Sequence, residues 1–531
     1  ARPIISMNRI FSAQGYRFYQ SSYDEDLEGS WLSVNYDPWG TGITYTGFCL
    51  MGLGCLLLLC ARDGGFRHLL RHPLIRKGGL FLIALFGGCQ LKADPALPVI
   101  KRVQADSLAI QQVVYNDRVA PFNTLARDFV QKIYGRPTFH GITPEQVVSS
   151  WMLYPEEWNR TPIIRIKNQE LRTALGLKEE YASLNHLFDG TQYKLQPLWQ
   201  REQGNRSKLA QAIQETDEKV GLILMLRQGT LIRPLPPDVT PLSTQKVNAE
   251  LWYNRIPFSK ILFMVNLTLG FAAFGLFMFR MLTGRKEKAV SRRVWGTALC
   301  LTTLFHATGY ALRGYIRGGF PLSNGYETMQ FVALAVLLTA CLLQRRFPFT
   351  RPFGFLLSGF TLLVAYLGEM NPQITPLMPV LASPWLSWHV SLIMISYGLF
   401  AFTFLNGILA LCLIGKQKNT ASPITGEQIE QLTLLSRLLL YPGTFLLGTG
   451  IVLGAVWANV SWGSYWSWDP KEVWALAAFI IYGISFHRKS LPYFQRPWLF
   501  HGYMIFAFAV VLTTYFGVNY LLGGMHSYAN S

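Results

Sequence analysis

The sequence predicts a polytopic α-helical membrane protein with about ten transmembrane helices and one additional soluble α+β domain. The first observation is composition: half of the 531 residues are hydrophobic and only 15% are charged, whereas soluble domains average about a quarter charged residues. The second is that long stretches of the chain carry no charge at all. These features argue against an ordinary soluble enzyme and against a disordered or fibrous chain.

Apolar runs close to the ~17–25 residues needed to cross a hydrocarbon core recur along the chain. We predict spans at 42–61, 260–281, 294–312, 326–344, 353–368, 390–414, 438–457, 472–487 and 498–520. A further run, 78–91, is short, but we expect a crossing there because the topology requires one.

The formal net charge of +18 is typical either of a nucleic-acid binder or of a membrane protein with basic loops. Nineteen Lys and Arg residues fall in the loops 62–77, 282–293, 345–351, 415–437 and 487–497. Only three fall in the alternate loops 313–325, 369–389, 458–471 and 521–531. Since positive charge is retained in the cytoplasm, the first set is predicted to be cytoplasmic. Segment 92–255 and both chain ends are then outside, and nucleic acid is not a partner.

Three regions follow from this topology. Residues 1–91 contain two spans, residues 92–255 form the extracytoplasmic soluble domain, and residues 256–531 contain eight spans. Within the soluble domain, 121–134 and 170–186 are predicted as amphipathic helices and 220–227 as a strand. Because the chain begins at Ala1 and no signal peptide precedes the first span, we expect further segments upstream.

All seven cysteines lie inside predicted spans, and the sequence contains no Cys-x-x-Cys. We therefore expect them to be small packing residues, and we expect no thiol–disulfide chemistry from this chain itself.

Two histidines and a tryptophan-rich loop are predicted to meet at the outer membrane surface. His389 opens one span at its outer end, and His526 follows the last span. The loop 457–474 on the same side contains Trp457, Trp462, Trp466, Trp468 and Trp474, and Asp469 can cap a helix that starts at Pro470. Such an aromatic surface between two imidazoles suits haem, whose iron accepts neutral histidine. An interfacial aromatic belt with polar anchors is the alternative.

The other histidines inside or beside spans are open to two interpretations. His306 lies within a span, where an ionisable group is a functional candidate, although a helix–helix hydrogen bond is the commoner role. The same alternative applies to His501, and His487 closes a span on the inner side.

Several segments together carry a resemblance to a known family. WGSYWSWDPKEVWAL (462–476) resembles the tryptophan-rich signature of the WWD haem-handling family, in the form found in CcsA of cytochrome c biogenesis system II. Segments 313–331, 383–398, 481–489 and 515–529 resemble further CcsA motifs in the same order. Segment 15–48 resembles the end of a CcsB/ResB-type partner. The chain is thus similar to a CcsB–CcsA fusion, with 256–531 as its CcsA-like part.

The resemblance implies a holocytochrome c synthase of the bacterial inner membrane. Such proteins carry haem b across the membrane and attach it to Cys-x-x-Cys-His of apocytochrome c on the periplasmic side, with thiol-reducing components as further partners. It implies that His389 and His526 ligate the iron at the external site and act in catalysis with Trp462, Trp466, Trp468 and Asp469. Trp474 would also contact haem, and His487 would be one ligand of a membrane site.

The sequence departs from the family pattern at this membrane site. The family's second membrane histidine lies in an early CcsB span that has no match here, so it lies upstream or His306 replaces it. The rival function is a haem exporter or chaperone that binds haem at the same residues and passes it to a separate ligase. A channel or ion-coupled transporter is disfavoured because the span of His306 contains no acidic partner.

Overall fold

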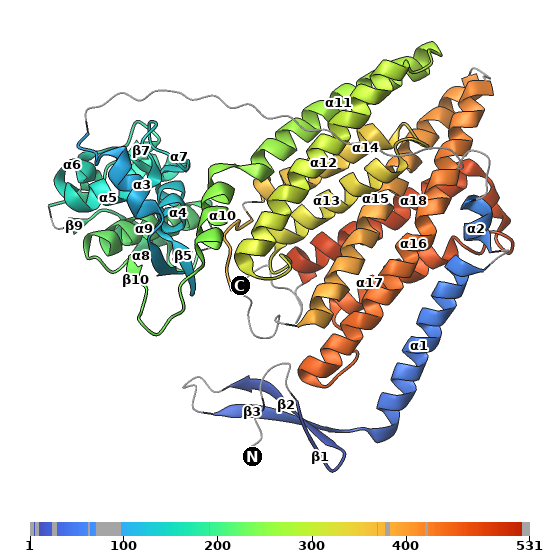
Figure 1. Cartoon of the computed structure of the whole chain (residues 1–531), viewed down its shortest axis with the longest axis horizontal. Helices are drawn as coiled ribbons and strands as arrows, with labels where there is room; N and C mark the ends of the chain where they lie inside the picture. The colour runs from blue at the N-terminus through green and yellow to red at the C-terminus, as the bar shows by residue number, and fades with distance from the viewer. Residues whose placement is uncertain are drawn as a thin grey trace.

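The computed structural model describes residues 5, 10–23, 29–61, 64–70, 97–190, 192–205, 207–368, 370–376, 383–419 and 423–522. Figure 1 shows a bundle of long helices, a globular region beside one end of the bundle and a small sheet near that same end. The prediction of a polytopic helical membrane protein is confirmed.

The bundle is built from long helices, each of which coincides with a predicted span. They are α1 (Pro38–Cys60), α11 (Phe258–Thr283), α12 (Ala289–Arg317), α13 (Gly325–Leu343), α14 (Thr350–Leu367), α15 (Pro384–Asn419), α16 (Pro423–Trp462), α17 (Pro470–Ile484) and α18 (Pro497–Leu512). A π-helical stretch, Thr513–Leu522, continues α18, while the short helix α2 (Gly65–Leu70) and a 3₁₀ turn (Pro492–Gln495) lie in connections.

Seven of the described helices are long and apolar enough to cross a membrane, which is fewer than the ten predicted spans. The exceptions are α12, which buries the polar side chains of Thr303, His306 and Arg313, and α17, which has only 15 residues. The predicted span 78–91 lies outside the described residues.

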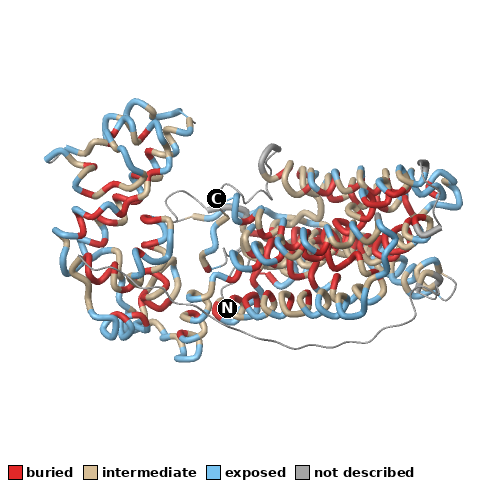
Figure 2. Tube along the Cα trace, turned by 90° about the horizontal axis from the view of Figure 1, so that it is seen from above, coloured by how far each residue is buried: buried red, intermediate tan, exposed pale blue. Residues whose placement is uncertain are grey.

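The bundle core lies between α13, α14, α15, α16 and α18, where buried side chains concentrate (Figure 2). In this core α15 packs along both α16 and α18, and Phe400 of α15 stacks on Tyr482 of α17 with ring centroids 3.6 Å apart. In contrast, the apolar window of α1 is wholly unburied, as expected for a helix that faces lipid.

The globular region, residues 97–255, has a core of its own around Trp151 and Trp158. Its helices are α3 (Arg102–Ala109), α4 (Phe122–Tyr134), α5 (Pro144–Leu153), α6 (Pro155–Arg160), α7 (Gln169–Ala174), α8 (Leu195–Glu202), α9 (Lys208–Arg227) and α10 (Thr244–Arg255). Its strands are β4 (Gln112–Tyr115), β5 (Arg118–Pro121), β6 (Ile164–Arg165), β7 (Tyr181–Ala182), β8 (Phe188–Asp189), β9 (Gln192–Tyr193) and β10 (Arg233–Pro234), and a 3₁₀ turn covers Asn185–Leu187.

One of the three elements predicted in this region is confirmed and two are wrong. Helix α4 matches the predicted 121–134. The predicted helix 170–186 ends at Ala174, and its second half contains β7 and the 3₁₀ turn. The predicted strand 220–227 is the last part of α9, whose Val220 and Ile223 are buried at a helical spacing. Its short apolar run fits a buried strand and a buried helix equally well.

The N-terminal strands β1 (Phe11–Ala13), β2 (Tyr16–Tyr23) and β3 (Ser30–Tyr36) form an antiparallel sheet in the order β1-β2-β3. This sheet leads into α1, where Asp37 caps the helix at Pro38 by accepting from the N–H of Gly40. It therefore lies at the end of the bundle where α16 ends. We call this end, which carries residues 463–469, the loop end, and the other the opposite end.

The globular region contacts the same loop end. The guanidinium of Arg118 pairs with Glu250 and donates through Nε to the carbonyl of Ile374 at 2.9 Å. The Asn116 amide also donates to the Gln373 side chain at 3.1 Å. Residues 370–376 connect α14 towards α15, so the globular region is fastened to the segment that precedes His389.

The Asp128 carboxyl of the globular region gives a testable pH dependence. Burial raises its pKa to about 6, against the favourable charges of Arg127 and Arg118. A carboxyl whose folded pKa lies above its unfolded value stabilises the fold at low pH, and this contribution disappears as the pH rises through 6. We expect Asp128→Asn to unfold at a higher temperature than wild type at pH 7.5 and the difference to shrink at pH 5. Equal differences at both pH values in thermal unfolding would contradict this.

Candidate functional site

The tryptophan-rich loop is held by the start of α17. Asp469 is the N-cap and Pro470 the first helical residue, so the predicted cap is confirmed. The Glu472 carboxylate accepts from the backbone N–H of Ser467 at 2.9 Å and from that of Asp469 at 3.2 Å. The buried Asp469 side chain accepts from the N–H of Lys471 at 3.1 Å. The two carboxylates thus fix the backbone on both sides of Trp468.

Trp468 occupies an unusual backbone conformation. Its φ is +59°, in the left-handed region that L-residues other than Gly, Asn and Asp rarely adopt, and its side chain is 73% exposed. Such strain persists only where surrounding contacts determine the backbone, and the bonds to Glu472 provide them here. The loop therefore presents a large aromatic side chain outward at the cost of a strained backbone.

The tryptophan rings form no single flat surface. Trp466 and Trp468 meet edge-on, with an interplanar angle of 88°, and Trp457 and Trp462 meet at 75°. The two pairs give a faceted surface because edge-to-face contacts are preferred between aromatic rings. Trp457 is buried, whereas Trp474 packs against the core between α15, α17 and α18.

His389 of α15 is set into the surface of α16. Its Nδ1 lies 2.7 Å from the carbonyl of Gly450, and the ring fills the space above Gly454. Because a carbonyl can only accept, Nδ1 carries the proton, and the neutral ring has its lone pair on Nε2. Histidines that ligate metals show this arrangement, in which a carbonyl orients the ring and fixes its tautomer. Gly450 and Gly454 were not singled out from the sequence, although their spacing of four residues could have indicated a close approach.

The other two predicted iron ligands, His526 and His487, do not lie beside His389 in the described structure. His526 lies outside the described residues. His487 follows the last turn of α17 at the opposite end, so it is far along the bundle from His389. His487 is exposed, and its backbone carbonyl accepts from the N–H groups of Ser490 and Leu491 at 3.1 and 2.7 Å.

The buried histidines of the bundle pair with polar side chains. His306 Nε2 lies 3.0 Å from the Gln330 side chain, whose amide donates to Ser259. This is the helix–helix hydrogen bond that was the commoner expectation for a histidine in a span. His501 Nε2 lies 2.9 Å from the Thr433 hydroxyl.

The N-terminal sheet braces the tryptophan-rich loop. The Asn35 amide donates to the carbonyl of Gly463 at 3.0 Å, and the buried Tyr19 ring packs on the same glycine. On the first turns of α1, Tyr45 and Phe48 both make edge contacts with Tyr465. Residues more than four hundred positions apart therefore shape one loop.

A buried ion cluster of Glu327, Arg313 and Arg317 also lies at the loop end of the bundle. Glu327 of α13 is 1% exposed and pairs with Arg313 at 2.8 Å and with Arg317 at 2.7 Å. Arg313 also donates to the carbonyls of Pro372 and Gln373. The cluster thus fixes α12, α13 and the segment that leads to α15.

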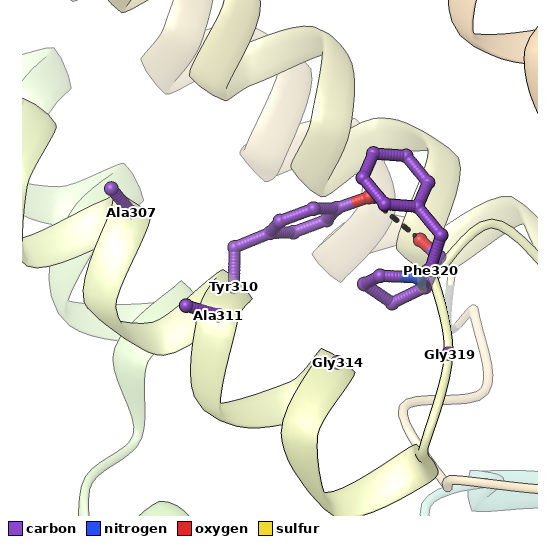
Figure 3. Close-up of a pocket in the computed structure, with 7 residues that line it drawn as sticks. Ala307, Tyr310, Ala311, Gly314, Gly319 and Phe320 are labelled. Atoms are coloured by element: carbon purple, nitrogen blue, oxygen red, sulfur yellow. Dashed lines mark hydrogen bonds between the residues drawn. The ribbon is translucent and has the colours of Figure 1, made fainter.

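A cavity of about 360 Å³ lies on the same end of α12 (Figure 3). Ala307, Ala311 and Gly314 of α12 line one side, and the segment 319–321 lines the other. The Tyr310 side chain reaches from α12 towards this segment, and its hydroxyl donates to the carbonyl of Pro321 at 2.8 Å. None of the predicted site residues lines this cavity, so we do not assign it to haem.

Comparisons with known proteins agree on one family. Residues 322–526 match the model of the cytochrome c assembly protein family. Protein NrfI of Wolinella succinogenes is 32% identical over 99% of this chain and 67% of its own length. The cytochrome c biogenesis proteins CcsA of Synechococcus sp. strains CC9902 and WH7803 are 32% and 33% identical, each over 49% of this chain and 95% and 94% of their own lengths.

Proposed function

Because the chain belongs to the cytochrome c assembly protein family, as a CcsB–CcsA fusion, we propose that it is a holocytochrome c synthase. It attaches haem b to the Cys-x-x-Cys-His motif of apocytochrome c. The two cysteine thiols add across the two haem vinyl groups, so each addition forms one S–C bond and moves one hydrogen to a vinyl carbon. Neither step requires a thiol from this chain, in which the described cysteines lie within α1, α12, α13 and α15.

The observation that carries the proposal is the geometry of His389. Its lone pair is on Nε2, and its ring orientation is fixed by Gly450 and Gly454, as an axial haem ligand requires. His526 is the proposed second ligand, and the histidine of the incoming Cys-x-x-Cys-His motif then replaces one of these two imidazoles. Holding the iron in this way positions the vinyl groups for the approaching thiols.

The loop 463–469 is proposed as the floor of this site. Trp462, Trp466 and Trp468 provide apolar facets for the porphyrin, and Trp474, which packs against the bundle core, is a further proposed haem contact. Asp469 and Glu472 act as positioning residues, because their bonds hold the loop backbone rather than reach outward. His487 is the proposed ligand of a membrane site at the opposite end.

We propose the following placement in the cell and along the chain. The chain lies in a bacterial inner membrane with its loop end in the periplasm, because the basic loops gather at the opposite end. Residues 1–91 are the closing part of a CcsB/ResB-like region, 92–255 an extracytoplasmic domain and 256–531 the CcsA-like domain.

The proposal is tested with the purified full chain, haem and a reduced apocytochrome peptide that contains Cys-x-x-Cys-His. We expect covalent haem on the peptide with wild type and at least about a 100-fold slower attachment with His389→Ala, since misplacing a reacting group by about 1 Å costs that much. His140→Ala, in the globular region, is the matched control and is expected to retain full activity.

The same experiment separates the synthase from a haem chaperone. Covalent attachment that depends on His389 supports the synthase. Transfer of haem to the peptide without a thioether bond, read from its loss on acid extraction, would identify a chaperone that supplies another ligase.

A further inference from the structure

Strand β3 is an open edge of the N-terminal sheet. Within the described residues the strand order is β1-β2-β3, so β3 pairs with β2 on one side and no described strand covers its other side. β3 has seven residues, against three in β1, and its sequence SWLSVNY contains neither a charged residue nor a proline. Natural proteins keep edge strands short or place Lys or Pro on them, because their unpaired N–H and C=O groups pair readily with another chain. Since β3 lacks these protections, we expect it to have a partner strand.

The two faces of β3 differ in what they contact, since side chains alternate between faces along a strand. Asn35 donates to the Gly463 carbonyl at 3.0 Å, and Tyr19, on the same face of the neighbouring strand, packs on this glycine. The opposite face carries Leu32 and Val34, which are both exposed. β3 therefore lies directly against the tryptophan-rich loop and presents an apolar face and an open edge to the outside.

An extended peptide suits this surface better than lipid does. Hydrocarbon offers no partner for the N–H and C=O groups of an open edge. A peptide added as a further strand, about 4.8 Å from β3, satisfies those groups through its own backbone. Apocytochrome c lacks the haem that stabilises its folded state, so it can offer such an extended segment.

Strand geometry also indicates which part of the apocytochrome pairs with β3. The two cysteines of Cys-x-x-Cys-His are three positions apart, so in a regular strand they would point to opposite faces. Both cysteines must approach the same haem, so the motif itself cannot continue the added strand. The paired segment is therefore one that flanks the motif, and the motif is left to bend over the tryptophan-rich loop.

We propose that β3 binds apocytochrome c by strand addition, pairing with an extended segment beside the Cys-x-x-Cys-His motif. The proposal rests on the proposed function and identifies where its protein substrate docks. Strand addition takes its affinity from main-chain hydrogen bonds, so the site accepts apocytochromes whose flanking sequences differ. The bond between Asn35 and Gly463 places the captured segment beside the loop proposed as the floor of the haem site.

The test measures peptide binding to the purified full chain without haem. A fluorescent peptide carries Ser in place of both motif cysteines and seven residues on each side of the motif, to match the length of β3, and fluorescence anisotropy gives its Kd. We expect Val34→Lys and Val34→Glu each to weaken binding by about tenfold, because a charge on an edge strand opposes pairing. The matched control Val34→Thr, uncharged and β-branched, should change the Kd by less than about twofold. Val34 is exposed, so the three variants are expected to fold.

A second measurement reports backbone pairing directly and uses the wild-type chain. Each peptide in a series carries one N-methyl group, which removes one backbone N–H, at successive positions of the flanking segment. Alternate N–H groups of a strand point to the same edge, so the effect should alternate along the series. At every second position we expect binding to weaken by about fivefold, the worth of one hydrogen bond, with little change at the positions between.

Equal Kd values for wild type and Val34→Lys, or N-methyl losses that do not alternate, would overturn the proposal. Weaker binding in Val34→Lys with tighter binding in Val34→Glu would also overturn it, since the peptide would then respond to charge alone. So would a dimer that Val34→Lys dissociates without changing the peptide Kd, because β3 would then pair with a second copy. A chain that shows the expected binding pattern but attaches no haem supports the docking site and contradicts only the proposed synthase activity.

Discussion

Glu327→Ala is expected to destabilise the folded chain by about 3–5 kcal/mol, the usual cost of removing one partner of a buried ion pair. The carboxylate is 1% exposed and neutralises both Arg313 and Arg317, so its loss leaves two buried positive charges. Glu327 also accepts from the backbone and hydroxyl of Ser323, and these bonds are lost as well. Thermal unfolding in detergent, followed by circular dichroism, measures the effect.

The matched control is Glu218→Ala, which removes an exposed ion pair with Lys132. Because solvent screens such a pair, we expect a loss of at most about 1 kcal/mol. If Glu327→Ala were no more destabilising than this control, the cluster would not be a structural support of the loop end. The variant should also attach haem poorly, since Arg313 holds the segment that precedes α15.

Gly454→Ala is expected to slow haem attachment by about 100-fold with little change in stability. A Cβ at this position would lie 2.5 Å from Cε1 of His389 and 2.6 Å from its Nδ1, so the imidazole must move. The movement breaks the 2.7 Å hydrogen bond between His389 Nδ1 and the Gly450 carbonyl. Without this bond the ring proton is no longer held on Nδ1, so the lone pair is no longer held on Nε2. Displacing a group that holds the reacting molecule by about 1 Å is enough for this loss.

Gly426→Ala, on the same helix, provides the comparison. The nearest atom to its new Cβ is the Gln417 amide nitrogen at 3.8 Å, which is an ordinary contact. Its attachment rate should equal that of wild type. A Gly454→Ala protein that retains both the rate and the haem spectrum of wild type would show that His389 is not confined by α16.

Much of the bundle could be predicted from the sequence because an apolar run long enough to cross a membrane leaves few alternatives to a helix. Composition alone does not identify a membrane-spanning helix when that helix is short or has a polar face. Helix α12 carries Arg313 and His306 on a buried face, so its composition does not show that these groups find partners on α13. Likewise, residues 220–227 could not be assigned by periodicity, since a short and mostly apolar run suits a strand and a helix alike.

The candidate site could be predicted in its residue types but not in its geometry. The spacing of Asp469, Pro470 and Glu472 gives the helix start directly, because the cap is a local interaction. The tautomer of His389 depends on Gly450, which lies 61 residues away, and the perpendicular packing of the tryptophans depends on where the chain turns.

The contact between Asn35 and Gly463 has a consequence for how this protein is encoded. The CcsA relatives match only the second half of this chain and nearly their whole length, so they have no covalent counterpart of β3. In a two-chain system the brace on the tryptophan-rich loop would form only after a bimolecular encounter. Here β3 is tethered, and its effective concentration at the loop is set by the intervening helices rather than by expression levels. Joining the two parts therefore makes completion of the loop independent of subunit stoichiometry.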